Sequence, residues 1–254
     1  MITAGVDIGS KTVKVVIVKD GKILSKVIMP GGRKKDEVAD QAFNEALEKA
    51  NVKREDVLKI VSTGAGKKKA LYAKDDISEV GADAKGVLFY FPNVRTVIDV
   101  GAEEGRGVKC DATGKVLDFV INEKCGAGAG SFTEAMSRAL EVKLEDMGQM
   151  SLTSHGAVPM NAQCAVFAES EVISLIHKKI PKEDIIKAVH DAIAARITSM
   201  IRTIGVEQDV CMVGGLSLNV GFVKSMKDAL GVDLLIPEDP EFIGALGAAL
   251  AAQG

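Results

Sequence analysis

The chain has 254 residues, of which 47% are hydrophobic and 26% charged, enough to bury the core of one large domain or of two ordinary halves. The net charge of −3, the sequence pI of about 5.8 and an aromatic content of 4% argue against nucleic acid as the main partner. No apolar stretch is as long as a membrane span, and the first residues form a strand pattern rather than a signal peptide. We therefore expect a cytoplasmic protein that does not bind a membrane.

The first thirty residues alternate between apolar and polar positions, which predicts strands at residues 3–8, 12–18 and 22–29. Asp20-Gly21 lies between the last two, and Asp-Gly between alternating runs is a strong signal for a β-hairpin. Periodicity predicts four further elements in chain order: a helix at 36–50, a strand at 57–62, a helix at 83–91 and a strand at 94–100.

The chain then repeats itself. Val6-Asp7-Ile8-Gly9 is answered by Ile98-Asp99-Val100-Gly101, and the Asp-Gly turn is answered by Thr113-Gly114. Two matches in register indicate duplicated halves, each a meandering sheet with helices on its faces, with a cleft shared between them. We place the first half at residues 1–93 and the second at 94–254, and expect the last helix to pack back on the first half.

The second half is mostly helical after Phe119. Pro181 precedes the longest predicted helix, in which apolar residues recur every three or four positions as far as Ile204. Three elements are expected after it: a strand at 209–213, a helix at 217–230 and a helix at 240–252. The last of these is rich in Gly and Ala, so it can pack very close to a neighbour.

Two acid-and-glycine turns can bind phosphate. In each of them, Asp7-Ile8-Gly9 and Asp99-Val100-Gly101, an acid lies at a strand end before a tight turn. The amides of the turn could face an anion, and the acid could hold the Mg²⁺ that accompanies ATP. Either copy alone is more simply a strand end with a turn, but the duplication favours a shared triphosphate site. Ser62–Lys67 resembles a P-loop, yet Val61 and Lys68 replace its required Gly and Ser/Thr, so we reject it.

Four cysteines, Cys110, Cys125, Cys164 and Cys211, lack the local spacing of a zinc ribbon or ferredoxin loop. Cys125 begins a run of alternating Gly and Ala, and a helical pattern follows both it and Cys164. A thiolate at a helix N-terminus is stabilised. Cys110 and Cys211 lie in apolar strand patterns and are interpreted as core residues. Cys125 could be a buried thiol or a cluster ligand; a cluster of four thiolates would need a symmetric dimer.

The acid-and-glycine turns and the two cysteine motifs, taken in chain order, resemble those of the BadF/BadG/BcrA/BcrD ATPase family. This family includes activators of (R)-2-hydroxyacyl-CoA dehydratases and ATPase subunits of benzoyl-CoA reductase. The resemblance covers essentially the whole chain, and its most specific parts are Cys125-Gly-Ala-Gly-Ala-Gly and Cys164-Ala-Val-Phe-Ala-Glu. It implies an α/β protein with the duplicated actin-like, sugar-kinase and Hsp70-type (ribonuclease H-like) ATPase fold and an interdomain nucleotide cleft.

The resemblance also implies roles for individual residues. Cys125 and Cys164 would ligate one 4Fe-4S cluster shared between two subunits. Asp7, Asp99 and Glu103 would be the catalytic acids, with ATP or ADP and Mg²⁺ as cofactors. The first phosphate loop would consist of Gly9, Ser10, Lys11, Thr12 and Lys14, and the second of Gly101, Ala102 and Glu103. The contact with the nucleoside would be Gly214 with Gly215.

In the family, ATP binding and hydrolysis change the angle between two helices at the cluster, and one low-potential electron passes to a larger iron-sulfur protein. Ferredoxin or flavodoxin would be the donor. The dehydratase activators carry Gly-Gly-Gln-Asp where this chain reads Gly101-Ala102-Glu103-Glu104. A Gln would orient the attacking water; Glu103 could accept its hydrogen bond, but brings charge close to the γ-phosphate. The acceptor therefore stays open among a 2-hydroxyacyl-CoA dehydratase, benzoyl-CoA reductase and a related double-cubane protein.

Two other classes of function stay open. One is a small-molecule kinase of the same fold, in which Asp99 or another acid would deprotonate a hydroxyl group. The other is a non-catalytic, ATP-dependent scaffold or chaperone-like switch. Neither class needs the paired cysteines, so the iron content of the protein distinguishes both from an electron-transfer protein.

Overall fold

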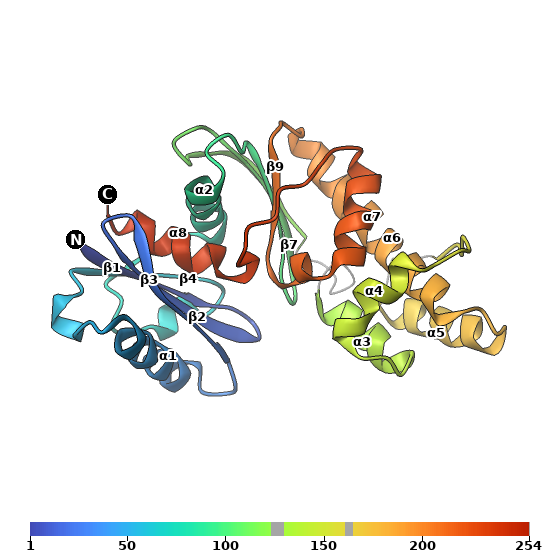
Figure 1. The fold of residues 1–254 in the computed structure, drawn as a ribbon, viewed down its shortest axis with the longest axis horizontal. Coiled ribbons are helices and arrows are strands. Elements are labelled where there is room, and N and C mark those ends of the chain that lie inside the picture. The colour runs from blue at the N-terminus through green and yellow to red at the C-terminus, as the bar shows by residue number, and fades with distance from the viewer. Residues whose placement is uncertain (123–129, 161–164, 254) are drawn as a thin grey trace. The chain divides into compact units, whose positions relative to one another are not determined.

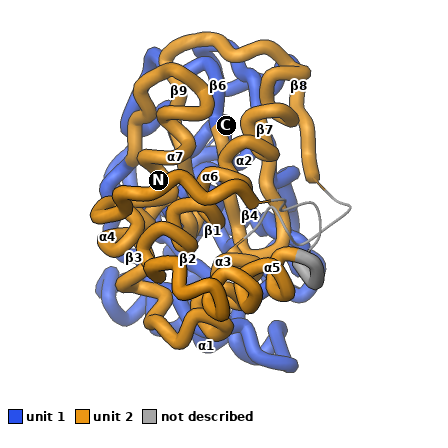
Figure 2. Tube along the Cα trace, turned by 90° about the vertical axis from the view of Figure 1, so that its right-hand side faces the viewer, with its two compact units in different colours: residues 1–97, 108–118, 237–254 blue, residues 98–107, 119–236 orange. Residues whose placement is uncertain are grey.

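The structure, a computed structural model, describes residues 1–122, 130–160 and 165–253. The chain divides into two compact units (Figure 2). Unit 1 comprises residues 1–97, 108–118 and 237–254, and unit 2 comprises residues 98–107 and 119–236. Each unit is thus assembled from separate pieces of the chain, while the domain boundary that we place at residue 93 stays a prediction.

Unit 1 is built on a five-stranded sheet with the strand order β3-β2-β1-β4-β5. Its strands are β1 (Ile2–Ile8), β2 (Thr12–Lys19), β3 (Lys22–Pro30), β4 (Lys59–Thr63) and β5 (Asp75–Asp76). The first three are antiparallel neighbours, whereas β4 runs parallel to β1. Asp20 and Gly21 join β2 to β3 with positive φ at both residues, as type I′ turns require, so the predicted hairpin is confirmed.

Different helices cover the two faces of this sheet (Figure 1). The helix α1 (Lys35–Ala50) packs on one face, where Phe43 is fully buried in a cluster with Val6. The helix α8 (Ile243–Ala251) packs on the other face, and α2 (Glu79–Tyr90) packs against α8. Successive side chains of a strand point to opposite faces, and accordingly Val6 contacts the α1 cluster while the neighbouring Gly5 contacts α8.

The helix α8 approaches its neighbours through backbone atoms. A Cβ at Gly5 would lie 1.9 Å from the Ala245 carbonyl oxygen, and a Cβ at Gly247 would lie 1.8 Å from the Ala82 carbonyl oxygen. Neither distance is possible for a real side chain. The close approach of α8 to β1 and to α2 therefore requires glycine at these two positions. The close packing predicted for this small-residue helix is confirmed.

The second sheet has the strand order β8-β7-β6-β9, which repeats the order β3-β2-β1-β4 of the first. Its strands are β6 (Thr96–Val100), β7 (Gly105–Cys110), β8 (Val116–Ile121) and β9 (Val210–Val213). Gly114 lies in the connection between β7 and β8 with φ +78°, as Gly21 does between β2 and β3 with φ +73°. The duplication predicted from the repeated motifs is therefore confirmed in strand order and in this turn.

Helices make up most of unit 2. They are α3 (Gly130–Ala139), α4 (Met147–Leu152), α5 (Ala165–His177), α6 (Lys182–Ile201) and α7 (Val220–Leu230). The predicted apolar face of α6 is buried, including Val189, Ile193 and Ile197. Cys110 and Cys211 are buried as well, so their interpretation as core residues is confirmed. No helix among the described residues has the length and apolar character needed to cross a membrane.

Two helix starts differ from the predictions because side chains cap the helices. The helix predicted at 83–91 begins earlier, at Glu79, since the Ser78 hydroxyl accepts the Gly81 amide at 3.2 Å. The helix predicted at 217–230 begins later, because Asn219 caps α7 by accepting the Phe222 amide at 2.9 Å. Short 3₁₀ turns replace the missing helical residues: Gly215–Leu218 precedes α7, and Pro240–Phe242 precedes α8.

Candidate functional site

The first predicted phosphate turn joins β1 to β2. It is closed by a hydrogen bond of 3.0 Å from the Gly9 amide to the Thr12 carbonyl. Asp7, which lies in β1 just before the turn, pairs with Lys14 opposite it on β2, with 3.3 Å between Asp7 Oδ2 and Lys14 Nζ. The two side chains are only 14% and 16% exposed, so a largely buried ion pair underlies the turn.

Gly64 lies directly after β4, against the other oxygen of the same carboxylate. A Cβ at Gly64 would be 2.4 Å from Asp7 Oδ1 and 2.6 Å from the Ile8 carbonyl oxygen, and φ at Gly64 is +87°. Only glycine satisfies both the conformation and the contact. The Asp7 carboxylate therefore lies between a lysine and a glycine.

The second turn, between β6 and β7, has the same construction. The Gly101 amide donates to the Glu104 carbonyl at 2.9 Å. Asp99, in β6, accepts two N–H groups of Arg106 at Oδ2, one of them from Nε at 3.2 Å. Both side chains are 9% exposed. Since Lys14 follows Asp7 by seven residues and Arg106 follows Asp99 by seven, the two ion pairs are equivalent in the repeat.

Gly214, directly after β9, corresponds to Gly64. Its φ is +85°, and a Cβ there would lie 2.2 Å from Asp99 Oδ1 and 2.5 Å from the Val100 carbonyl oxygen. Each glycine also begins a 3₁₀ turn: the Lys67 amide donates to the Gly64 carbonyl and the Ser217 amide to the Gly214 carbonyl, both at 3.1 Å. Sequence reasoning missed Gly64, because the segment was tested only against the P-loop pattern.

The two turns are supported from behind by different elements. In unit 1, Lys35 Nζ donates to the Gly9 carbonyl at 2.8 Å. In unit 2, the first residues of α3 donate to the turn: the Gly130 amide to the Gly101 carbonyl and the Ser131 amide to the Ala102 carbonyl, both at 2.8 Å. Neither support was predicted from the sequence.

The predicted binding residues of each turn are at least partly exposed, whereas most residues of the neighbouring strands are buried. Ser10 and Thr12 are half-buried and Lys11 is exposed. In the second turn Ala102 is half-buried and Glu103 is exposed. Backbone amides in tight turns of this kind can bind an anionic group.

Two predicted site residues, Cys125 and Cys164, lie outside the described residues. The described helices α3 and α5 begin at Gly130 and Ala165. Within residues 1–122, 130–160 and 165–253, no group of three or more His, Cys, Asp or Glu side chains could hold a metal ion.

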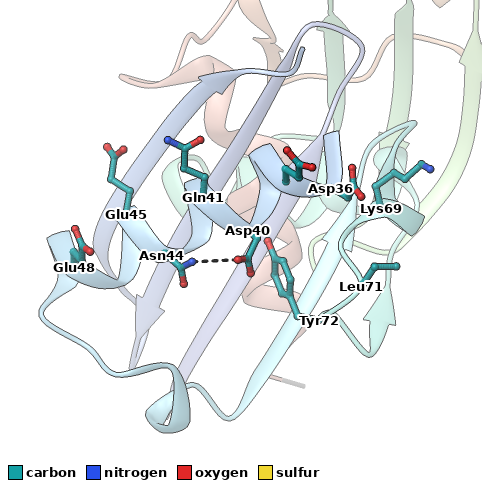
Figure 3. A pocket seen from close by; sticks show the side chains of 10 residues that line it. Asp36, Asp40, Gln41, Asn44, Glu45, Glu48, Lys69, Leu71 and Tyr72 are labelled. Carbon is teal, nitrogen blue, oxygen red and sulfur yellow. Dashed lines mark hydrogen bonds between the residues drawn. The ribbon is translucent and has the colours of Figure 1, made fainter. Parts of the chain in front are cut away.

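A hollow of about 720 Å³ lies elsewhere in unit 1, along α1 and the segment 69–72 (Figure 3). It contains none of the predicted site residues. Its floor includes Tyr72, which stacks on Phe43 and donates to the Ala39 carbonyl at 2.7 Å; burial raises the pKa of this tyrosine. Five carboxylates line it: Asp36, Asp40, Glu37, Glu45 and Glu48. So many negative charges would repel a phosphate group, so we do not assign nucleotide binding to this hollow.

Known proteins share both the sequence and the fold of this chain. The family model of the BadF/BadG/BcrA/BcrD ATPase family matches residues 4–252. The (R)-2-hydroxyglutaryl-CoA dehydratase component A of Acidaminococcus fermentans is 36% identical, with a TM-score of 0.95 over 99% of this chain and 97% of that chain. An activator of the 2-hydroxyisocaproyl-CoA dehydratase from Clostridium difficile, with bound ADPNP, is 37% identical, with a TM-score of 0.93 over 99% and 94%.

A more distant structure supports the fold alone. A ROK family glucokinase from Streptomyces griseus is 16% identical and has a TM-score of 0.62, with 100% of both chains covered. The expected duplicated fold of actin-like and sugar-kinase ATPases is thereby confirmed. The match over residues 4–252, on a chain with two equivalent turns of this kind, means that the protein belongs to the BadF/BadG/BcrA/BcrD ATPase family.

Proposed function

We propose that this protein is an ATP-dependent reductive activator, which couples ATP binding and hydrolysis to the transfer of one low-potential electron into a partner iron-sulfur enzyme. The partner would be a 2-hydroxyacyl-CoA dehydratase, benzoyl-CoA reductase or a related double-cubane protein. The observation that carries the nucleotide-dependent part of the proposal is the doubled turn, in which an aspartate lies between a cation and a glycine in each unit. Membership of the family and the relatives named as dehydratase activators support it.

The nucleotide would bind with its phosphates at both turns. Amides of residues 10–12 and 102–103 would donate to phosphate oxygens, since the Gly9 and Gly101 amides close the turns, and Lys14 would add positive charge. Asp7 and Asp99 would hold Mg²⁺, directly or through water, since carboxylates are the ligands that this ion prefers. Gly214 and Gly215 would let the backbone approach the nucleoside.

Glu103 is the proposed residue for positioning the hydrolytic water. Its side chain is exposed beside the second turn, where a carboxylate can accept a hydrogen bond from water. The same negative charge would lie near the γ-phosphate, so we expect slow hydrolysis by the isolated protein. ADP would be the product that stays at the turns.

The thiolates of Cys125 and Cys164 would hold the iron-sulfur cluster. A 4Fe-4S cluster takes four thiolates, and the other cysteines, Cys110 and Cys211, are buried in the protein interior. Two chains would therefore contribute two thiolates each, which makes the proposed protein a homodimer. The cluster would supply one-electron chemistry at low potential, with ferredoxin or flavodoxin as the donor in the cytoplasm.

The first experiment is anaerobic purification, with iron and sulfide analysis and a visible spectrum before and after dithionite. We expect about two irons per chain, which is half of a four-iron cluster. Cys125→Ala and Cys164→Ala should each remove the iron. Cys211→Ala is the matched control, because its sulfur is buried and should leave the iron content unchanged.

Protein that stays colourless and iron-free after anaerobic reconstitution, yet binds ATP, would overturn the electron-transfer role. In that case phosphorylation of a hydroxyl acceptor would be assayed next, because a kinase of this fold needs no iron.

A further inference from the structure

Three hydrogen bonds join the start of α3 to the second turn. The Gly130 amide donates to the Gly101 carbonyl at 2.8 Å, and the Ser131 amide donates to the Ala102 carbonyl at 2.8 Å. The Ser131 hydroxyl donates to that same Ala102 oxygen at 2.6 Å. The contact is tight, since a Cβ at Gly130 would lie 3.2 Å from the Gly101 oxygen.

These bonds fix the direction of the amides in the turn. The only cis peptide bond among the described residues is Gln208-Asp209, so the peptides of the turn are trans and their C=O and N–H groups point in opposite directions. Because the Gly101 and Ala102 carbonyls face α3, the following amides, of Ala102 and Glu103, point away from α3. Two neighbouring amides turned the same way form the kind of site that binds an anion.

The helix that makes these bonds is itself fixed in the core of unit 2. Phe132, Met136 and Leu140 are each no more than 2% exposed. A movement of the turn would therefore be passed to the start of α3, because a helix packed in this way cannot absorb it. In the sequence, Gly130 follows Cys125 by five residues.

The first turn is supported by other elements, within unit 1. Its Gly9 carbonyl is held by the Lys35 side chain, and the Gly31 amide holds the Lys11 carbonyl at 2.7 Å. Lys35 is the first residue of α1, and Gly31 lies between β3 and α1. The two turns therefore share a geometry but are connected to different parts of the chain.

We propose that Ser131 is a positioning residue for the second turn, and that its hydroxyl transmits a nucleotide-dependent change at Ala102 and Glu103 into the first turn of α3. This inference rests on the proposed nucleotide role of the second turn. It assigns Gly130, the last residue of the cysteine motif in the sequence analysis, and the following Ser131 to the nucleotide site.

The experiment compares Ser131→Ala with Ser131→Thr and with Ser137→Ala. Ser137 is the matched control, because its hydroxyl lies on the same helix but donates only within it, to the Glu134 carbonyl at 2.9 Å. Hydrogen exchange of peptides covering residues 130–139 is measured by mass spectrometry, with and without ADPNP. The affinity for ADPNP is measured in parallel by calorimetry.

In the wild type, ADPNP should slow exchange at the start of α3. In Ser131→Ala this slowing should fall about fivefold, the factor expected for one ordinary hydrogen bond, while the affinity changes less than about threefold. Ser131→Thr should restore the slowing, and Ser137→Ala should retain it. Full slowing in Ser131→Ala, or equal loss in Ser137→Ala, would overturn the inference and leave the proposed function intact. A wild type that does not bind ADPNP would overturn both.

Discussion

The two acid-and-glycine turns keep the same ion-pair chemistry and differ in burial and support. Both place an aspartate between a cation and a glycine. The ion pair of the second turn is more buried, with side chains 9% exposed instead of 14% and 16%. The first turn is held by a lysine side chain and the second by the backbone and hydroxyl of α3. The comparison teaches that duplication preserved the geometry of the turns while the connections behind them diverged.

The largest effect is expected for Gly214→Ala, because the added Cβ would lie against Asp99 Oδ1 in a left-handed conformation. We expect a loss of stability of about 4 kcal/mol from the combined clash and strain. Gly64→Ala, with the equivalent contact in unit 1, should behave in the same way. Urea unfolding measures both.

Gly231→Ala isolates the conformational part of that cost. Its φ is +74°, but a Cβ there would meet nothing within 4 Å. We expect a loss of about 1 kcal/mol. Equal losses of unfolding free energy in Gly214→Ala and Gly231→Ala would mean that the contact with Asp99 does not contribute to the effect.

Asp99→Asn should destabilise the protein more than Asp7→Asn. Removing the charge beside the buried Arg106 guanidinium should cost about 3 kcal/mol, whereas the more exposed Lys14 pair should cost about 1 kcal/mol. Unfolding in urea at low and at high salt measures both losses. The ranking would be refuted by a larger loss for Asp7→Asn.

The units should also differ in their response to acid, since all three histidines lie in unit 2. His190 is fully buried, and burial lowers its pKa to about 4. Asn219, whose oxygen caps α7, turns its amino group to His190 Nε2 at 3.2 Å, so this nitrogen is an acceptor and the ring is neutral. The ring N–H then faces the Ser151 hydroxyl, 3.2 Å from Nδ1.

A folded-state pKa below the unfolded value means that stability is complete above about pH 6.5 and falls as the pH drops towards 4. Between pH 7 and pH 5, this histidine should cost about 2 kcal/mol. His190→Gln should flatten the pH dependence of stability, measured by urea unfolding at each pH, and the exposed His177→Gln should not. At pH 5, the protection of backbone amides against hydrogen exchange should fall more in α6 and α7 than in α1.

Lys35→Met removes the side-chain support of the first turn and should act on nucleotide affinity. Without that bond the Gly9-Ser10 peptide can rotate, and the affinity for ATP should fall about tenfold, equivalent to a charged hydrogen bond of about 1.4 kcal/mol. Lys34→Met is the control, because Lys34 pairs with Glu37 at the surface. Equal affinities for ATP in the two variants, measured by calorimetry, would show that the first turn needs no support from α1.

Local features were predictable from the sequence. The Asp20-Gly21 hairpin, the apolar face of α6 and the repeated acid-and-glycine turns depend on nearby residues or on a strict period. The helix starts at Glu79 and Val220 were missed, because single side-chain caps decide them and periodicity does not record them.

Contacts between distant segments were not predictable. Gly64 belongs to the first turn only because β4 lies parallel to β1 and brings Thr63 beside Asp7. Ser131 reaches Ala102 across 29 positions, and no local pattern encodes such a pair. The pairing of Cys125 with Cys164 stays a prediction.

The packing of α8 has a consequence for how the protein is made. Residues 237–254 complete unit 1, yet the ribosome produces them after all of unit 2. Until they emerge, the face of β1 that carries Gly5 has no covering helix, although α1 can already pack on the opposite face. Unit 2 should therefore be synthesised completely before α8 covers the sheet of unit 1. Until then, that apolar sheet face is exposed to aggregation with other proteins.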